Sequence, residues 1–213
     1  MSARRALLLD LDDTLVVEEP AAVAAFQATA GWAATQRDLD PDPLATAARS
    51  RARELWHATP AHAWCRRIGI SSWEGLWCRF EGEEPDVRWL RAWAPAYRRE
   101  AWRLALAEQG VEDAALAQEL GERFARERRE RHETFPGAAA ALDALADQHA
   151  LALVTNGAAC LQREKLAASG LADRFVTVVV SADVGTAKPD PAIFRHALAQ
   201  LGCASGEATM VGD

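Results

Sequence analysis

Two aspartates near the N-terminus, Asp10 and Asp12, are the residues best suited to chemistry. They follow a short apolar run and stand two positions apart, so in an extended segment their side chains point the same way. Two carboxylates at close range repel each other and perturb each other's pKa values. A divalent cation would relieve that repulsion, and ligands made only of oxygen favour Mg²⁺ over zinc. One carboxylate can then act as a nucleophile through an acyl-phosphate, while the other protonates a leaving oxygen and later activates water.

Further polar residues follow later apolar segments. Thr155, Asn156 and Gly157 follow the second, where a hydroxyl and nearby backbone N–H groups can hold phosphate oxygens. Lys188 comes after the third and can neutralise phosphate charge, and Asp213 comes after the fourth. Taken singly, each has a plainer interpretation, because Asn-Gly is a common turn pair and a lysine in a loop is usually solvated.

The elements that must position these residues are four buried strands. Their apolar runs cover residues 6–11, 150–154, 175–180 and 208–211. Helical patterns separate the last three, which predicts parallel βαβ units in a doubly wound sheet. Ligands of such sheets bind beyond the carboxyl ends of the strands, so we expect the polar residues to converge there.

The segment between the first and second strands has a helical pattern throughout. Its size predicts a cap domain of residues 18–133, inserted into a Rossmann-like catalytic core of residues 1–17 and 134–213. Within the cap, Pro95 is expected to break or kink a long helix.

We expect mainly structural roles for the tryptophans and for the remaining polar residues. All eight tryptophans lie in the cap segment, seven of them within residues 56–102, where we expect helix packing for most of them. Trp56, His57 and His62 are weaker candidates for contacts that set substrate choice. Gln162 and Lys165 are interpreted as polar positions on a helix.

Four runs together resemble one known family. LLLDLDDTL, LALVTNG, GTAKPDPAIF and MVGD are similar, in order and spacing, to motifs I to IV of the haloacid-dehalogenase-like superfamily, whose motif I is DxDxT. Four motifs in order are far more specific than any one alone. The insertion after motif I resembles the helical cap called C1.

The resemblance implies a role for each matching acid. Asp10 would be the nucleophile and a Mg²⁺ ligand, and Asp12 the general acid/base that gives its backbone carbonyl to the metal. Asp213 would complete the metal shell. Members of the family usually continue motif IV to a second acid and a further strand, whereas this sequence stops at Asp213. We therefore expect a missing C-terminal edge strand, as in a fragment or truncated form.

The resemblance also implies a phosphate-binding set. Thr155 would bind the phosphoryl group with backbone help from Asn156 and Gly157, and Lys188 would stabilise both the nucleophile and the phosphate. Within the family, the sequence is most similar to the branch of nucleoside 5'-monophosphatases and N-acylneuraminate-9-phosphatase-like enzymes.

Asp12 favours one reaction type. Dehalogenases of the superfamily lack this second aspartate, because no leaving oxygen needs a proton. The sequence therefore predicts a Mg²⁺-dependent phosphomonoester hydrolase acting through an aspartyl-phosphate on a nucleotide or sugar phosphate. The alternatives are a phosphomutase, a dehalogenase, or a catalytically impaired or non-catalytic protein of the same fold, the last suggested by the incomplete motif IV.

Bulk properties exclude other classes. The chain has 213 residues, 50% of them hydrophobic, and a net charge of −7, which argues against nucleic acid or an anionic membrane as partner. Its four cysteines form no CxxC pair, so a zinc site is not expected. No stretch has the length of a membrane span, and we expect a cytoplasmic enzyme.

Overall fold

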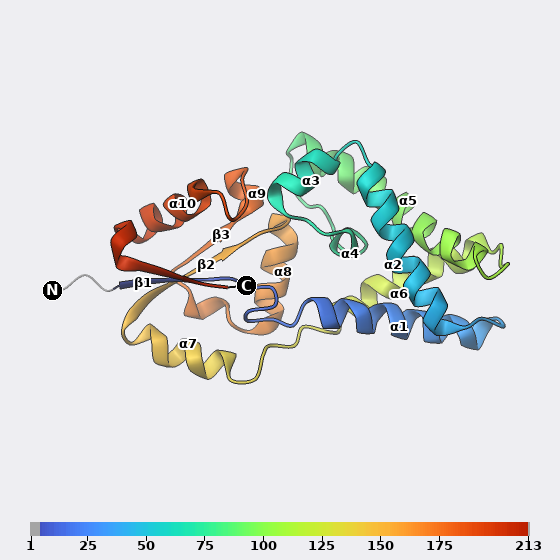
Figure 1. The fold of residues 1–213 in the computed structure, drawn as a ribbon, viewed down its shortest axis with the longest axis horizontal. Coiled ribbons are helices and arrows are strands. Elements are labelled where there is room, and N and C mark those ends of the chain that lie inside the picture. The colour runs from blue at the N-terminus through green and yellow to red at the C-terminus, as the bar shows by residue number, and fades with distance from the viewer. Residues whose placement is uncertain (1–4, 213) are drawn as a thin grey trace. The chain divides into compact units, whose positions relative to one another are not determined.

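The computed structural model describes residues 5–212 and divides the chain into two compact units (Figure 1). The core unit comprises Met1–Glu18, Arg67–Gly69 and His132–Asp213, and the cap unit comprises Glu19–Arg66 and Ile70–Arg131. The short piece Arg67–Gly69 therefore clusters with the core, although the sequence on both sides of it belongs to the cap.

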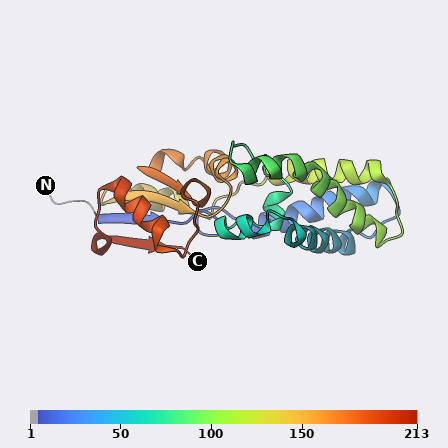
Figure 2. The same cartoon turned by 90° about the horizontal axis from the view of Figure 1, so that it is seen from above.

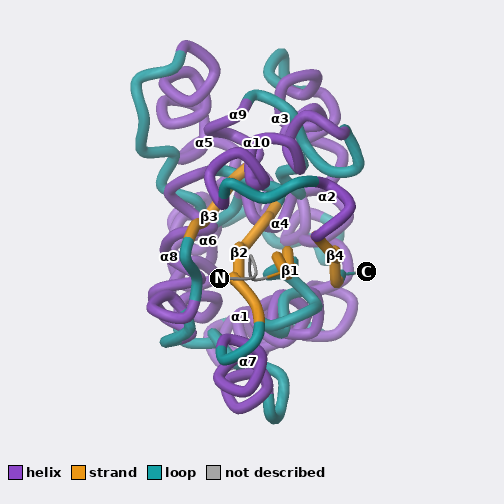
Figure 3. The backbone as a smooth tube through the Cα atoms, turned by 90° about the vertical axis from the view of Figure 1, so that its left-hand side faces the viewer, coloured by secondary structure: helices purple, strands orange, loops and turns teal. Residues whose placement is uncertain are grey.

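The core unit is built on one parallel sheet with strand order β3-β2-β1-β4 (Figure 3). Its strands are β1 (Arg5–Leu9), β2 (His149–Thr155), β3 (Thr177–Val180) and β4 (Ala208–Val211). Its helices are α7 (Ala138–Ala146), α8 (Ala159–Ser169), α9 (Ser181–Val184) and α10 (Pro191–Leu201), with short 3₁₀ turns at Ala172–Arg174 and Ser205–Glu207. The predicted Rossmann-like α/β fold is confirmed.

Both faces of the sheet are covered, which explains why its strands are continuous apolar runs. Because side chains alternate along a strand, Leu7 and Leu9 of β1 join a cluster formed with α7 and α8. Ala6 and Leu8 join the opposite cluster, which α10 completes. Burial on both faces leaves the ends of the strands as the place for polar side chains.

The cap unit is wholly helical. It contains α1 (Glu19–Gln36), α2 (Pro41–Ala58), α3 (His62–Ile68), α4 (Ser72–Gly75), α5 (Pro85–Ala107) and α6 (Ala114–Arg129). The four long helices α1, α2, α5 and α6 lie side by side (Figure 2), each in contact with two of the others. None of the helices in residues 5–212 is long and apolar enough to cross a membrane.

The expected break at Pro95 does not occur, because α5 runs through that residue as one helix. A proline inside a helix removes one backbone hydrogen bond. Here α5 packs against both α2 and α6 and buries Leu90, Ala94 and Tyr97 around the proline. This packing on two sides outweighs the local propensity for a break.

Three cap tryptophans, Trp56, Trp77 and Trp102, are buried and serve packing. Trp77 and Trp102 are fully buried. Trp56 is 2% exposed, its indole N–H donates to the Ile70 carbonyl at 3.3 Å, and its ring packs near that of Tyr97. The side chain of Trp56 is thus held within the cap unit itself.

Candidate active site

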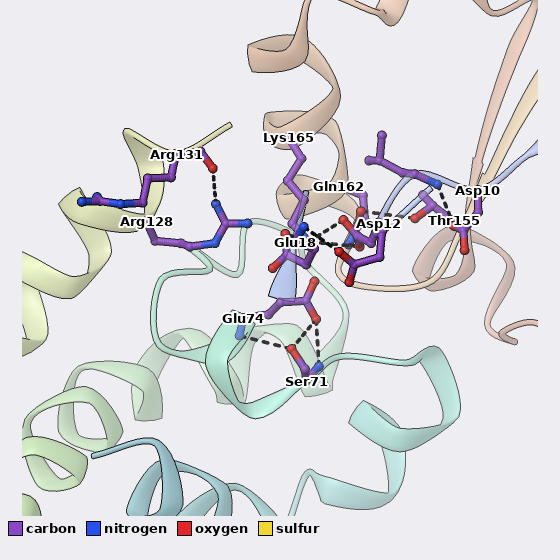
Figure 4. Close-up of polar contacts among 12 residues, drawn as sticks. Asp10, Asp12, Glu18, Ser71, Glu74, Arg128, Arg131, Thr155, Gln162 and Lys165 are labelled. Carbon is purple, nitrogen blue, oxygen red and sulfur yellow. Dashed lines mark hydrogen bonds and ion pairs between the residues drawn. The ribbon is translucent and has the colours of Figure 1, made fainter. Parts of the chain in front are cut away.

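Most of the predicted site residues lie at the carboxyl ends of β1 and β2, which are neighbours in the sheet, whereas Lys188 comes after β3. Asp10 comes directly after β1, and Thr155 is the last residue of β2. The parallel register pairs Leu9 with Leu153, so both strands end at the same edge (Figure 4). The sheet topology therefore brings motifs I and II together, although 145 residues separate Asp10 from Thr155.

Asp10 is buried and held at several atoms. Its Oδ1 accepts a hydrogen bond from the Leu11 amide at 2.7 Å, and its Oδ2 forms an ion pair with Lys188 Nζ. Its own amide donates to the carbonyl of Val211, the last residue of β4, at 2.9 Å. At 7% exposed, Asp10 presents a restrained carboxylate at the sheet edge.

Asn156 links motif II to Lys188. The Asn156 Oδ1 accepts from the Lys188 amide at 2.8 Å, and its Nδ2 donates to the Lys188 carbonyl at 3.2 Å. The Asn156 side chain thus fixes the backbone of the residue whose ammonium meets Asp10. The sequence predicted that Asp10, Asn156 and Lys188 lie together. It predicted a role for the backbone of Asn156 but none for its side chain.

Gly157 adopts a conformation suited to glycine, with φ of +136°. Its amide donates to the Ile68 carbonyl and to Ser181 Oγ, both at 2.9 Å. The hydroxyl of Ser181 in turn donates to the Ile68 carbonyl. The amide of Gly157, predicted to help bind phosphate, therefore has protein acceptors in this structure.

The loop after Asp10 is organised by local hydrogen bonds. Asp13 has a left-handed backbone, with φ of +51°, and its Oδ1 accepts from the Glu18 amide at 2.9 Å. The amides of Leu15 and Val16 both donate to the Leu11 carbonyl. Asp13 therefore helps to orient the loop that follows Asp10.

Asp12 has partners that were not predicted (Figure 4). Lys165 Nζ lies 3.0 and 3.1 Å from its two carboxylate oxygens and 3.0 Å from Glu18 Oε2. Gln162 Nε2 donates to Asp12 Oδ2 at 3.1 Å. Gln162 Oε1 accepts from Thr155 Oγ1 at 3.3 Å. Buried polar groups therefore join the two motifs.

A signal for these partners was present in the sequence. Gln162 and Lys165 are three positions apart on α8, so they share one helix face. The residues beside them, Leu161 and Leu166, are buried, and both polar side chains are only 1% exposed. Their position on the apolar face of a helix that follows motif II was the signal that could have identified Gln162 and Lys165 from the sequence.

The oxygen donors present fit a magnesium ion better than a softer metal. The Asp10 carboxylate and the Asp12 backbone carbonyl are hard donors of the kind Mg²⁺ prefers. Gly212 lies against Asp10, because a Cβ on it would be 2.9 Å from the Asp10 Cβ. Asp213, the third predicted ligand, is outside the described residues. Within residues 5–212, no group of three His, Cys, Asp or Glu side chains is arranged to hold a metal.

Residues 5–212 thus form a parallel α/β core and a separate helical unit, with the Asp10 carboxylate at the carboxyl end of β1. The family model described as haloacid dehalogenase-like hydrolase matches residues 4–213, and the chain belongs to that family. The phosphoserine phosphatase of Thermus thermophilus is 42% identical over 208 residues, which cover 97% of this chain and 80% of that protein. The N-acylneuraminate-9-phosphatase of Rattus norvegicus is 41% identical over 63 residues, which cover 30% of this chain and 25% of that protein.

Solved structures agree on the fold. The HAD-hydrolase YfnB from Bacillus subtilis, in a magnesium-bound crystal structure, matches all of this chain and 79% of its own, with a TM-score of 0.60 and 23% identity. The 2-haloacid dehalogenase from Pseudomonas syringae matches 99% of this chain and 78% of its own, with a TM-score of 0.56 and 28% identity. The resemblance stated from the motifs is confirmed, and so is the enzyme class, a phosphatase of the haloacid dehalogenase-like family.

Proposed function

We propose that this enzyme hydrolyses small phosphate monoesters through an aspartyl-phosphate on Asp10, with Mg²⁺ as cofactor. The observation that carries the proposal is a pair of separately held carboxylates in one loop. Asp10 is held by Lys188, and Asp12 is held by Lys165 and Gln162. One carboxylate would serve as nucleophile and the other as acid and base.

The first step transfers the phosphoryl group. An oxygen of Asp10 attacks phosphorus, the bond from phosphorus to the ester oxygen breaks, and protonated Asp12 gives its proton to the departing oxygen. Lys188 lies beside the nucleophile and would balance negative charge on the phosphoryl oxygens. Thr155, with backbone help from Asn156, would hold those oxygens in place.

The second step restores the enzyme. Asp12, now a carboxylate, takes a proton from water, and the oxygen of that water attacks phosphorus. The bond from phosphorus to Asp10 breaks, so inorganic phosphate leaves and Asp10 is free again. The proton that Asp12 gained is the one it donates in the next cycle, and the reaction consumes one ester and one water.

Magnesium would be held by the Asp10 carboxylate and the Asp12 backbone carbonyl, with Asp213 as the third protein ligand. When bound, the ion neutralises charge on the phosphoryl oxygens and on the nucleophile.

The substrate class is a small phosphorylated metabolite, a nucleotide or sugar phosphate by the motif resemblance. The relatives add phosphoserine as a candidate. The match to the Thermus thermophilus phosphoserine phosphatase spans 97% of this chain and so includes the cap segment. A match of 63 residues, as with the N-acylneuraminate-9-phosphatase, is too short to include the cap. We therefore place phosphoserine first in the substrate panel.

The test is phosphate release from p-nitrophenyl phosphate, phosphoserine, nucleoside 5'-monophosphates and sugar phosphates. We expect activity that requires added Mg²⁺, is lost in EDTA and is abolished by Asp10→Asn. Unchanged activity in that variant or in EDTA would contradict the proposal. Absence of Mg²⁺ binding by calorimetry, together with no turnover, would favour a non-catalytic role.

Dehalogenation is the second candidate, because a 2-haloacid dehalogenase is 28% identical over 99% of this chain. Asp12 weighs against it, since halide leaves without needing a proton. Halide release from 2-haloacids, measured beside phosphate release, decides between the two. Transfer of phosphate to a second sugar position, without free phosphate, would indicate a phosphomutase.

The expected cytoplasmic location stays a prediction.

A further inference from the structure

One buried amide connects the predicted phosphate-binding hydroxyl to the predicted acid/base. Gln162 Oε1 accepts from Thr155 Oγ1 at 3.3 Å, and Gln162 Nε2 donates to Asp12 Oδ2 at 3.1 Å (Figure 4). The amide can make both contacts only in one orientation, with oxygen towards Thr155 and nitrogen towards Asp12. At 1% exposed, Gln162 is shielded from the bulk solvent that would otherwise compete for both partners.

Gly157 leaves the space that this amide occupies. A Cβ at Gly157 would be 2.4 Å from Gln162 Nε2 and 3.1 Å from its Cδ. Both distances are shorter than ordinary contacts, so any larger residue at Gly157 would displace the amide. The absence of a side chain at Gly157 thus allows Gln162 to occupy its position, which is an observation independent of the two hydrogen bonds.

Lys165 restrains Asp12 from the same helix. Its ammonium lies 3.0 Å from Asp12 Oδ1 and 3.1 Å from Oδ2, and 3.0 Å from Glu18 Oε2. A buried ammonium is costly unless it is paired, and here it meets two carboxylates. Both oxygens of Asp12 therefore have partners on α8.

We propose that Gln162 is a positioning residue that aims the Asp12 carboxyl at the leaving-group oxygen, with Lys165 as the second anchor. The inference rests on the proposed function, because it assigns a support to the acid/base of that reaction. A group that transfers a proton must be held within hydrogen-bond reach of its target, and buried polar partners restrict it to that geometry. The role assigned to Gln162 is indirect, because it acts on the reaction through Asp12 and Thr155.

This role predicts a dependence on the leaving group. An alkoxide leaving from an aliphatic phosphate needs the proton from Asp12 as the ester bond breaks. The 2,4-dinitrophenolate ion is a stable anion and leaves without it. Misplacing Asp12 should therefore slow phosphoryl transfer from the aliphatic ester far more than transfer from the aryl ester. The second step, which also uses Asp12, is the same for both esters, so the comparison is made on kcat/KM, which reports the steps up to loss of the leaving group.

The experiment compares Gln162→Met with the parent enzyme on glycerol phosphate and on 2,4-dinitrophenyl phosphate. Methionine keeps the length of the side chain and removes both hydrogen bonds. General acid catalysis contributes about 10²- to 10⁴-fold, so we expect kcat/KM on glycerol phosphate to fall about 10- to 100-fold. On the aryl ester kcat/KM should change less than about threefold, whereas kcat can fall on both esters through the water step that they share. Activity on the aryl ester also reports that the variant is folded.

The matched control is Arg163→Gln, the adjacent position on α8. Arg163 is exposed and pairs with Asp183, which is also exposed. This variant should keep the activity of the parent on both esters. If Gln162→Met is not folded, Gln162→Leu provides the same comparison.

Two results would overturn the inference. Equal loss of kcat/KM on both esters would place the effect on the nucleophile, on phosphate binding through Thr155 or on the fold. Unchanged kcat/KM on glycerol phosphate would show that Asp12 needs no such support. If the parent enzyme releases phosphate from neither ester, the proposed function itself has failed, and the inference fails with it.

Discussion

The side-chain amide of Asn156 holds the backbone of Lys188 from both sides, accepting from its N–H at 2.8 Å and donating to its carbonyl at 3.2 Å. The ammonium of that lysine meets the Asp10 carboxylate. Asn156 can thus influence the predicted nucleophile without touching it.

Replacing Asn156 with alanine should therefore lower kcat by releasing Lys188. Small displacements of a catalytic group can cost up to about 100-fold, and we expect a fall of about 10- to 100-fold in phosphate release. The measurement compares Asn156→Ala, Lys188→Met and the double variant. If Asn156 acts through Lys188, the double variant is no slower than Lys188→Met alone. Losses that multiply would show that the two residues act separately.

Lys165 should be essential for stability as long as its carboxylate partners are present. The ammonium and Glu18 are almost completely buried, with side-chain exposures of 1% and 6%. Lys165→Met removes the ammonium from this buried carboxylate, and breaking a buried pair costs about 3–5 kcal/mol of unfolding free energy. Adding Glu18→Gln removes the buried negative charge, so the double variant should recover part of that loss. Urea denaturation of both variants measures this, and equal instability of the two would contradict it.

The strand ends were predictable because a strand that is buried on both faces is a continuous apolar run in the sequence. The run before Asp10 is apolar at every position from Ala6 to Leu9, and such a run can only be a buried element. Because β1 and β2 are parallel neighbours, their carboxyl ends lie on the same side of the sheet, which brings Asp10 and Thr155 together.

The partners of Asp12 were not predictable in the same way. Gln162 and Lys165 are buried because α8 presents that face to a loop about 150 positions earlier in the chain. Helical periodicity identifies which face of a helix is buried, but it does not identify the segment that packs against that face. Pro95 failed as a helix break for the same reason, since the packing that keeps α5 continuous comes from α2 and α6.

Two helical glycines of the cap should respond in opposite directions to alanine. A Cβ at Gly75 would lie 2.4 Å from the ring of Trp56, which is buried and rigid. Overpacking of this kind costs about 1–3 kcal/mol, so Gly75→Ala should lower the unfolding free energy by that amount. A Cβ at Gly31, within α1, would meet nothing within 4 Å. Gly31→Ala should raise the unfolding free energy by about 0.5–1 kcal/mol.

Urea denaturation, with Trp fluorescence as the signal, measures both changes. A destabilised Gly31→Ala would show that the helix propensity argument fails in α1. A neutral Gly75→Ala would show that Trp56 moves aside at no cost, which its buried packing against Tyr97 argues against.

The buried thiol of Cys65 should make the protein less stable at alkaline pH. Burial, which penalises the thiolate, raises the pKa of Cys65 from 9.0 to about 12, and the negative charge of Asp86 adds to the effect. Between these values the unfolded chain has lost the thiol proton while the folded chain keeps it. The unfolded state therefore binds fewer protons, and the unfolding free energy falls as the pH rises from about 9 towards 12.

Cys65→Ala removes this contribution and should show a shallower decline in unfolding free energy between pH 9 and 11. Burial also raises the pKa of Tyr97, which adds a decline of the same sign in both proteins. Cys65 also contributes to the raised pKa of Tyr97, so the difference between the two slopes reports the thiol together with its effect on Tyr97, even if alanine lowers stability at every pH. Urea denaturation at pH 8, 9, 10 and 11 gives the slopes, and parallel curves would mean that the thiol titrates equally in the folded and unfolded states.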